Sequence, residues 1–265
     1  MKTFIEVQKN RHGKSVSMPR HERMARQVHV SENVHVPTIW NYYTRPPIAV
    51  LGLSIALTCT YATVHYDTLA IHIPEDDNFS RSWKYFTLLF AHSNVTHLLN
   101  NVALVLAAGV LLESLNGPIS VVFLFVICGI LGAMVQVLVM EIVRPLRSYY
   151  MLGASPGTYA LVGAEMSNVA LNWSVMPYAK VRVIAVSLLV IIESVVMFVD
   201  EETRDRTAYV SHIGGAVFGS LYGFGCLRVI PQDFRTRTMQ KMSMVVAGVS
   251  SAVVAAARVI HWLET

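Results

Sequence analysis

After a polar first stretch, the chain alternates between long apolar runs and short polar connections. Residues 1–46 are polar, basic and rich in histidine, and they predict a flexible tail rather than a folded domain. A helix that crosses a bilayer needs about 20 mostly apolar residues. The pattern therefore predicts an all-α, polytopic bundle of membrane helices. Seven segments fit this length: 47–66, 85–112, 118–141, 155–173, 181–199, 209–230 and 242–262.

The composition supports a membrane protein and argues against several other classes. Hydrophobic residues make up 54% of the chain and charged residues 14%, whereas a soluble domain carries roughly 25% charged residues. The three cysteines all lie in apolar segments, so we predict neither a disulfide framework nor a zinc site. The net charge of +4 is modest, and we expect no nucleic-acid partner. The first apolar run begins near Pro47, so no secretory signal peptide is predicted.

Lysine and arginine residues are distributed unevenly between the two ends of the predicted helices. Fourteen fall in the N-terminal tail and in the loops near 174–182 and 228–241, and six fall in the loops on the other side. Short loops rich in Lys and Arg stay cytosolic. We therefore expect a cytosolic N-terminus and a lumenal or extracellular C-terminus. The second, fourth and sixth helices then begin on the non-cytosolic side.

The fourth predicted helix begins with a serine among small residues. Ser155 is preceded by Gly153 and Ala154 and followed by Pro156 and Gly157. Proline is well tolerated at the first helical position, so Ser155 is expected to cap the helix and Pro156 to open it. The free N–H groups at a helix N-terminus stabilise a developing negative charge. Ser155 is therefore a candidate nucleophile, although a single serine in a membrane helix usually serves only in packing.

The sixth predicted helix begins with a histidine followed by a glycine stripe. Gly215, Gly219 and Gly223 recur every four residues, a spacing that lets two helices approach closely. His212 lies three residues before Gly215 and so shares its face. An ionisable group inside a membrane segment is a functional candidate, with a structural histidine as the alternative. The stripe predicts that this imidazole is brought against a neighbouring helix.

The second predicted helix carries further polar groups at its start. His97 and Asn101 are four residues apart and share a face, and both can donate hydrogen bonds to an oxyanion. His92 lies five residues before His97, a rotation of about 140° on a helix, so we expect it to face elsewhere. A membrane zinc protease needs two histidines four apart with a glutamate after the first. Ser93 follows His92, so no metal site is predicted.

Three glutamates lie in or at the ends of apolar helices: Glu113, Glu165 and Glu193. We interpret them as hydrogen-bond partners inside the bundle. A transporter with carboxylate proton relays is the competing interpretation. A catalytic aspartate pair is not predicted, because no Asp occurs inside the second, third, fourth or sixth helix.

Taken together, these motifs resemble those of rhomboid proteases. That family has its nucleophile in Gly-x-Ser, a histidine followed by a glycine stripe, and a His-x4-His-x3-Asn run. The corresponding residues are Gly153-Ala-Ser155, His212-Ile-Gly-Gly215 with Gly219, and His92-x4-His97-x3-Asn101. Trp83-Lys84, Glu113 and Tyr159 also match, the last as a tyrosine that packs against the catalytic histidine.

The resemblance covers residues 47–230, for which it implies a six-helix catalytic core. A cytosolic loop and a seventh transmembrane helix then occupy residues 231–265, an arrangement similar to the animal secretory-pathway branch of the family. The resemblance therefore implies a location in the secretory pathway or the plasma membrane. Two positions depart from the pattern. Pro156 stands where the family has Gly or Ala, and Glu165 stands where animal relatives often have His.

The resemblance implies a serine endopeptidase that needs no cofactor. Ser155 would be the nucleophile and His212 the general base and acid, while His97, Asn101 and the Ser155 N–H would form the oxyanion hole. Gly153, Tyr159, His92, Gly215 and Gly219 would support the site.

The partners implied by the resemblance are the lipid bilayer and single-pass transmembrane substrates, cut near the non-cytosolic face. The oligomeric state stays open. The non-enzyme alternative is a catalytically weak or inactive relative that binds membrane clients for trafficking or degradation. The external loop 67–84 is expected to lie partly in the membrane surface, and it carries the glycosylation sequon Asn78-Phe-Ser80.

Overall fold

A computed structural model describes residues 46–143, 148–199, 208–230 and 234–264, so the predicted tail lies outside the described residues except for Pro46. The long helices are α2 (Ile48–Thr63), α5 (Val95–Asn116), α6 (Pro118–Phe123) continuing through η4 (Leu124–Cys128) into α7 (Gly129–Val143), α8 (Ser155–Asn172), α9 (Ala179–Val199), α11 (Tyr209–Cys226) and α12 (Phe234–Glu264). The short elements are α3 (Tyr66–Leu69), β1 (Ile71–Ile73), η2 (Phe79–Arg81), α4 (Lys84–Thr87), η3 (Leu88–Phe90) and β2 (Tyr149–Met151).

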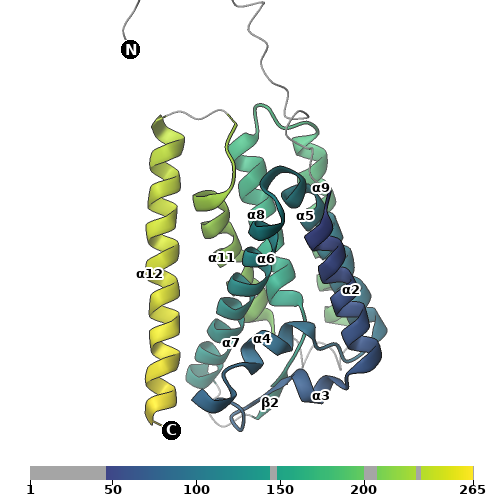
Figure 1. Ribbon diagram of the computed structural model, residues 1–265, viewed down its shortest axis with the longest axis vertical. Coiled ribbons are helices and arrows are strands. Elements are labelled where there is room, and N and C mark those ends of the chain that lie inside the picture. The colour runs from purple at the N-terminus through teal and green to yellow at the C-terminus, as the bar shows by residue number, and fades with distance from the viewer. Residues whose placement is uncertain (1–45, 144–147, 200–207, 231–233, 265) are drawn as a thin grey trace, which may run out of the picture. The chain divides into compact units, whose positions relative to one another are not determined.

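The predicted all-α membrane bundle is confirmed, and each predicted segment corresponds to a long helix in the described part of the chain (Figure 1). Three of the described helices are long and apolar enough on their own to cross a membrane: Val95–Asn116, Pro118–Val143 and Phe234–Glu264. Exposed apolar side chains cover much of α9 and α12. Since lipid is as apolar as these side chains, such surfaces suit a bilayer.

The second helix begins ten residues later than the predicted 85–112. Residues 84–90 form α4 and η3, and Ala91 is extended. The side chain of Asn94 then accepts a hydrogen bond from His97 N at 2.8 Å and so caps α5. The sequence did not predict this interruption, because hydropathy alone does not distinguish one long helix from several short helical turns.

The last two helices also differ from their predicted bounds. α11 ends at Cys226 rather than 230, because the extended residues after it bond back to the bundle. Arg228 N donates to Asn116 Oδ1 at 2.8 Å, and Ile230 N donates to Asn172 Oδ1 at 2.9 Å. α12 is longer than the predicted 242–262, since its polar first turns continue the helix.

Helix α8 is the centre of the bundle, with most of its residues buried and contacts to α5, α7, α9 and α11. Its contact with α11 depends on two glycines of the predicted stripe. A Cβ at Gly215 would come within 2.1 Å of Pro156 O, and one at Gly219 within 2.0 Å of Ala160 O. The stripe therefore lets backbone pack against backbone, as predicted.

Two of the three glutamates do bind inside the bundle, and the third differs. The fully buried Glu113 accepts hydrogen bonds from Ala49 N and Val50 N, both at 2.8 Å, and so caps α2. Glu165 accepts from Asn168 Nδ2 at 3.0 Å and from Arg182 Nε at 2.9 Å. Glu193 is 3% exposed and makes no hydrogen bond of standard geometry among the described residues, although its carboxyl lies close enough to the Tyr159 hydroxyl to interact with it.

One end of the bundle carries the external loop and the only strands in the described residues. β1 pairs antiparallel with β2, with Ile71 opposite Met151 and Ile73 opposite Tyr149. In Figure 1, β2, α3 and α4 lie at this end, and the C-terminal end of α12 lies beside them. The large side chains of Phe79 and Trp83 are exposed here.

Candidate active site

Ser155 and His212, 57 residues apart in the chain, are hydrogen-bonded inside the bundle. Ser155 Oγ lies 2.7 Å from His212 Nε2, and the two residues are only 5% and 6% exposed. Ser155 is the first residue of α8 and His212 lies in the first turn of α11. When the ring carries its proton on Nδ1, the serine hydroxyl donates to Nε2. This is the arrangement of a nucleophile and its base.

The start of α8 differs by one residue from the prediction. Ala154 is the cap and its carbonyl accepts from Thr158 N at 2.9 Å, so Ser155 is the first helical residue and Pro156 the second. The reason is that proline suits any position in the first turn, where N–H groups have no partner within the helix. The N–H of Ser155 therefore stays outside the helical ladder, as the prediction required.

Aromatic rings and an amide orient the histidine. Tyr159 stacks on His212 with ring centroids 4.5 Å apart and planes inclined by 18°, and Tyr209 meets the ring edge at 6.4 Å. Gln136 Oε1 accepts from Ser211 N at 3.1 Å and so holds the first turn of α11. Sequence reasoning missed Gln136, although a lone glutamine within an apolar membrane segment is itself a signal.

His97 faces the nucleophile across the backbone of Gly153. This glycine has φ +119°, a backbone conformation that residues with a side chain rarely adopt. A Cβ built on it would lie 2.8 Å from His97 Nε2 and 3.7 Å from Ser155 Oγ. The absence of a side chain at Gly153 therefore lets the His97 ring pack directly against the backbone two residues before the nucleophile.

Asn101 lies one turn further along α5 and is fully buried. Its Nδ2 donates to His97 O at 2.9 Å, which leaves its second N–H for another acceptor. Thr158 Oγ1, 3.4 Å from Asn101 Oδ1, ties the amide to α8. Thr158 was not predicted as a site residue, because nothing in the sequence around it indicates that it meets Asn101 when the helices pack.

The expectation that His92 faces away from His97 is wrong. The two rings are 5.0 Å apart in an edge-to-face contact. The rotation argument assumed one helix through both residues, but α5 begins only at Val95. His92 is 3% exposed and supports His97 from the preceding loop, so its predicted structural role is retained.

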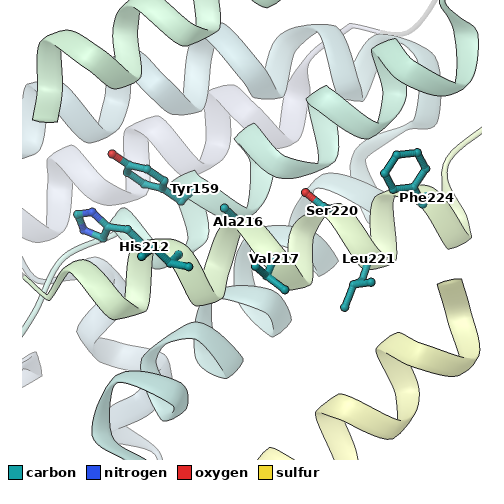
Figure 2. A pocket seen from close by; sticks show the side chains of 8 residues that line it. Tyr159, His212, Ala216, Val217, Ser220, Leu221 and Phe224 are labelled. Atoms are coloured by element: carbon teal, nitrogen blue, oxygen red, sulfur yellow. The ribbon is translucent and has the colours of Figure 1, made fainter. Parts of the chain in front are cut away.

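A groove of about 450 Å³ begins at the histidine and follows α11 (Figure 2). Figure 2 shows its side chains along one face of the helix, with Tyr159 reaching over His212. Apart from these two residues and Ser220 the lining is apolar: Ile213, Ala216, Val217, Leu221 and Phe224. An apolar segment fits such a groove.

One cluster among the described residues has the ligand atoms of a metal site. Atoms of Asp77, Glu141 and His261 lie within 4.8 Å of one another. The guanidinium of Arg258 donates to both carboxylates. One of their two negative charges is thus neutralised by a protein cation, so the cluster is better described as an ion-pair network.

Comparison with known proteins gives one matching family and several relatives. The model of the Rhomboid domain family matches residues 80–229. Rhomboid-related protein 1 of Caenorhabditis elegans is 28% identical over 178 residues, covering 65% of this chain and 48% of the relative. Rhomboid-related protein 3 of Homo sapiens is 28% identical over 166 residues, with coverage of 59% and 39%.

Rhomboid-like protease 2 of Toxoplasma gondii is 26% identical over 152 residues, covering 57% of this chain and 50% of the relative. The chain thus spans about half the length, or less, of these relatives. The matched residues 80–229 include every residue of the site described above, whereas α2 and α12 lie outside them.

Proposed function

This chain belongs to the rhomboid family, and from that premise we propose that it is an intramembrane serine endopeptidase. The observation that carries the proposal is the 2.7 Å contact between Ser155 Oγ and His212 Nε2 within a bundle of membrane helices. One similar protein is named a protease.

In the proposed reaction, Ser155 Oγ attacks the scissile carbonyl carbon while His212 Nε2 accepts the hydroxyl proton. The C–N bond then breaks as His212 returns the proton to the leaving amine, which leaves an acyl group on Ser155. Water, deprotonated by the same histidine, hydrolyses this ester. Among the described residues His212 forms no ion pair with a carboxylate, so the stacked Tyr159 takes over the orienting role that an acid has in a triad.

The negative charge on the carbonyl oxygen needs donors in a site that excludes water. We assign this role to the Ser155 N–H, His97 and the free N–H of Asn101. Support comes from the close packing of the His97 ring against Gly153, two residues before Ser155, and from the buried Asn101 one turn further along α5. Losing one such donor typically lowers the rate roughly 10²–10³-fold.

We propose single-pass transmembrane proteins as the substrates, cut near the non-cytosolic face. The apolar groove along α11 is suited to an apolar segment that approaches from the lipid. The uneven distribution of Lys and Arg supports a cytosolic N-terminus and a lumenal or extracellular C-terminus.

The test is cleavage of a co-expressed single-pass protein by wild type, Ser155→Ala, His212→Ala and the control Ser114→Ala. Within the described part of the chain, the Ser114 hydroxyl bonds only to the carbonyl one turn back, so its variant should cleave normally. We expect both site variants to be expressed but inactive. Cleavage that both retain would refute the protease assignment. A folded wild type that neither cleaves nor reacts with a fluorophosphonate would favour a client-binding role.

A further inference from the structure

Arg258 is a buried cation on the most exposed of the long helices. Most side chains of α12 are exposed, yet Arg258 is 0% exposed. Its Nη1 donates to both oxygens of Glu141, at 2.8 and 2.9 Å, and its Nη2 donates to Asp77 Oδ2. A charged group in a membrane helix is costly unless it is paired. The position of α12 is therefore coupled to α7 and to the external loop.

Asp77 is the point where the external loop meets α12. Besides Arg258, its carboxylate accepts from Trp262 Nε1 at 2.8 Å and from Tyr85 OH at 3.1 Å. Burial alone would raise the pKa of Asp77, but the hydrogen bonds from Arg258 and Trp262 hold it below its usual value of 3.8. We call Arg258, Trp262, Asp77 and Glu141 the α12 clamp.

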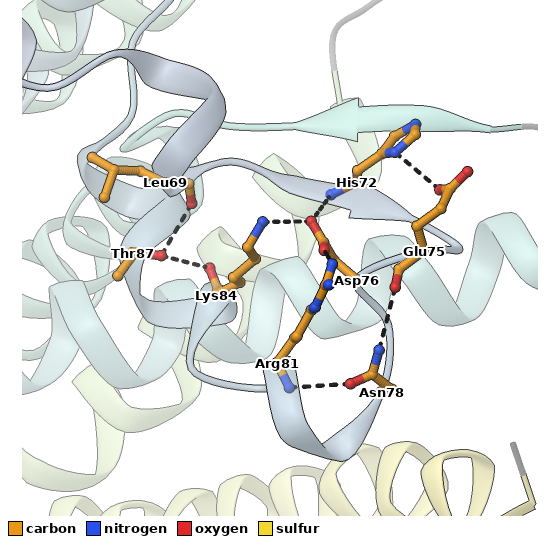
Figure 3. A network of polar contacts seen from close by, with 8 residues as sticks. All are labelled: Leu69, His72, Glu75, Asp76, Asn78, Arg81, Lys84 and Thr87. Carbon is orange, nitrogen blue, oxygen red and sulfur yellow. Dashed lines mark hydrogen bonds and ion pairs between the residues drawn. The ribbon is translucent and has the colours of Figure 1, made fainter.

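The external loop is itself cross-linked by polar contacts (Figure 3). Asp76, next to the clamp, accepts from His72 N at 3.0 Å, from Lys84 Nζ at 2.5 Å and from Arg81. Thr87 Oγ1 donates to Leu69 O at 3.0 Å and closes the base of the loop. These contacts connect Asp76, and with it the neighbouring Asp77, to β1 on one side and to α4 on the other.

Both sides of the loop hold the segment that leads to the nucleophile. β1 pairs with β2, where Ile71 is opposite Met151. On the other side, Leu88 O accepts from Gly153 N at 2.9 Å. Gly153 is the residue that separates His97 from Ser155 Oγ. The contacts thus run without a gap from α12 to the oxyanion side of the site.

We propose that Arg258 is a positioning residue for the nucleophile, acting through the α12 clamp and the external loop. This rests on the proposed function, and it assigns a task to a helix that the family model does not include. Misplacing reacting groups by about 1 Å can cost roughly 100-fold in rate. Loosening the clamp should therefore slow the chemistry at Ser155 itself and leave substrate binding unchanged.

The test compares the rate at which a small fluorophosphonate labels Ser155 in full-length wild type, Arg258→Met, Arg258→Lys and Lys241→Met. Lys241 is an exposed cation on the same helix and serves as the control. At a temperature well below melting, we expect Arg258→Met to label about tenfold more slowly. Arg258→Lys should recover part of the loss, and Lys241→Met should match wild type. With a single-pass substrate, kcat should fall and KM should stay the same.

Equal labelling by folded wild type and Arg258→Met would overturn the proposal, as would a rise in KM at unchanged labelling. If Arg258→Met does not fold, Trp262→Phe decides, because it removes one donor to Asp77 and keeps the ring contacts. We expect it to label more slowly than wild type, and an unchanged rate would overturn the proposal. A wild type that is not labelled at all would refute the proposed function instead.

Discussion

Two contacts join distant parts of this chain by different chemistry. Between α8 and α11, Gly215 and Gly219 bring backbone against backbone and carry His212 to Ser155. Between α12 and the external loop, Arg258 and Asp77 form a buried ion pair. The first contact has no space for another atom. The second depends on charge, so a substitution that keeps the charge should preserve part of it.

The largest expected effect comes from filling the α8–α11 contact. In Gly215→Val the new side chain starts 2.1 Å from Pro156 O, and overpacking costs about 1–3 kcal/mol or more. We expect labelling of Ser155 by a fluorophosphonate to fall to background and the melting temperature to drop. Gly248→Val is the control, because nothing lies within 4 Å of a Cβ there. Similar labelling of the two variants would contradict the close contact.

A smaller effect is expected from the ring that orients His212. Tyr159→Leu removes the stacking, which contributes about 0.5–1.5 kcal/mol, so labelling should slow by up to about tenfold. Tyr159→Phe keeps the ring and should label at close to the wild-type rate. If Phe lost as much as Leu, the hydroxyl rather than the stacking would be the important group.

Part of the site can be predicted from the sequence alone, and part cannot. Ser155, His212, His97 and Asn101 were predictable, because hydropathy and charge place their helix starts on one side of a membrane and the motifs are specific. The contact of His92 with His97 was not, because it depends on where α5 begins.

The α12 clamp was also beyond sequence reasoning. Arg258 was visible only as a charge inside the last apolar segment. Its partner Asp77 is 181 residues away, and nothing local to either residue indicates the other. Long-range pairing of this kind is set by the packing of whole helices, which a single sequence does not reveal.

The ionic contacts of the external loop should respond to pH, unlike the glycine contact. Burial alone would raise the pKa of Asp76, but hydrogen bonds from Lys84, His72 N and Arg81 lower it from 3.8 to about 2. A carboxyl with a lowered pKa stabilises the fold above its unfolded pKa and loses that effect as the pH falls through the folded value.

Wild type should therefore have a higher melting temperature than Asp76→Asn at neutral pH. This gap in melting temperature should close between pH 3.8 and about pH 2. Thermal melting in detergent measures this. Asp67→Asn, at an exposed carboxylate, is the control and should show little gap at any pH. A gap for Asp76→Asn that is unchanged at the lowest pH would contradict the ionic account of the loop.

The smallest effect is expected at the edge of the clamp. His261 Nε2 lies 3.8 Å from Asp77 Oδ2 and 3.6 Å from Glu141 Oε1, and its side chain is 36% exposed. Because the imidazole is partly exposed and both distances are long, we expect these pairs to contribute about 0–1 kcal/mol. His261→Gln should label at close to the wild-type rate. A loss as large as that of Arg258→Met would show that the imidazole is as important to the contact as the guanidinium.

The central claim is that Ser155 is a nucleophile activated by His212. Peptide mass spectrometry of the full chain in proteoliposomes, after treatment with a fluorophosphonate, tests it most directly. The account predicts one adduct, on Ser155, which is absent from folded His212→Ala. A folded wild type without an adduct on Ser155, or labelling that persists in Ser155→Ala, would contradict it.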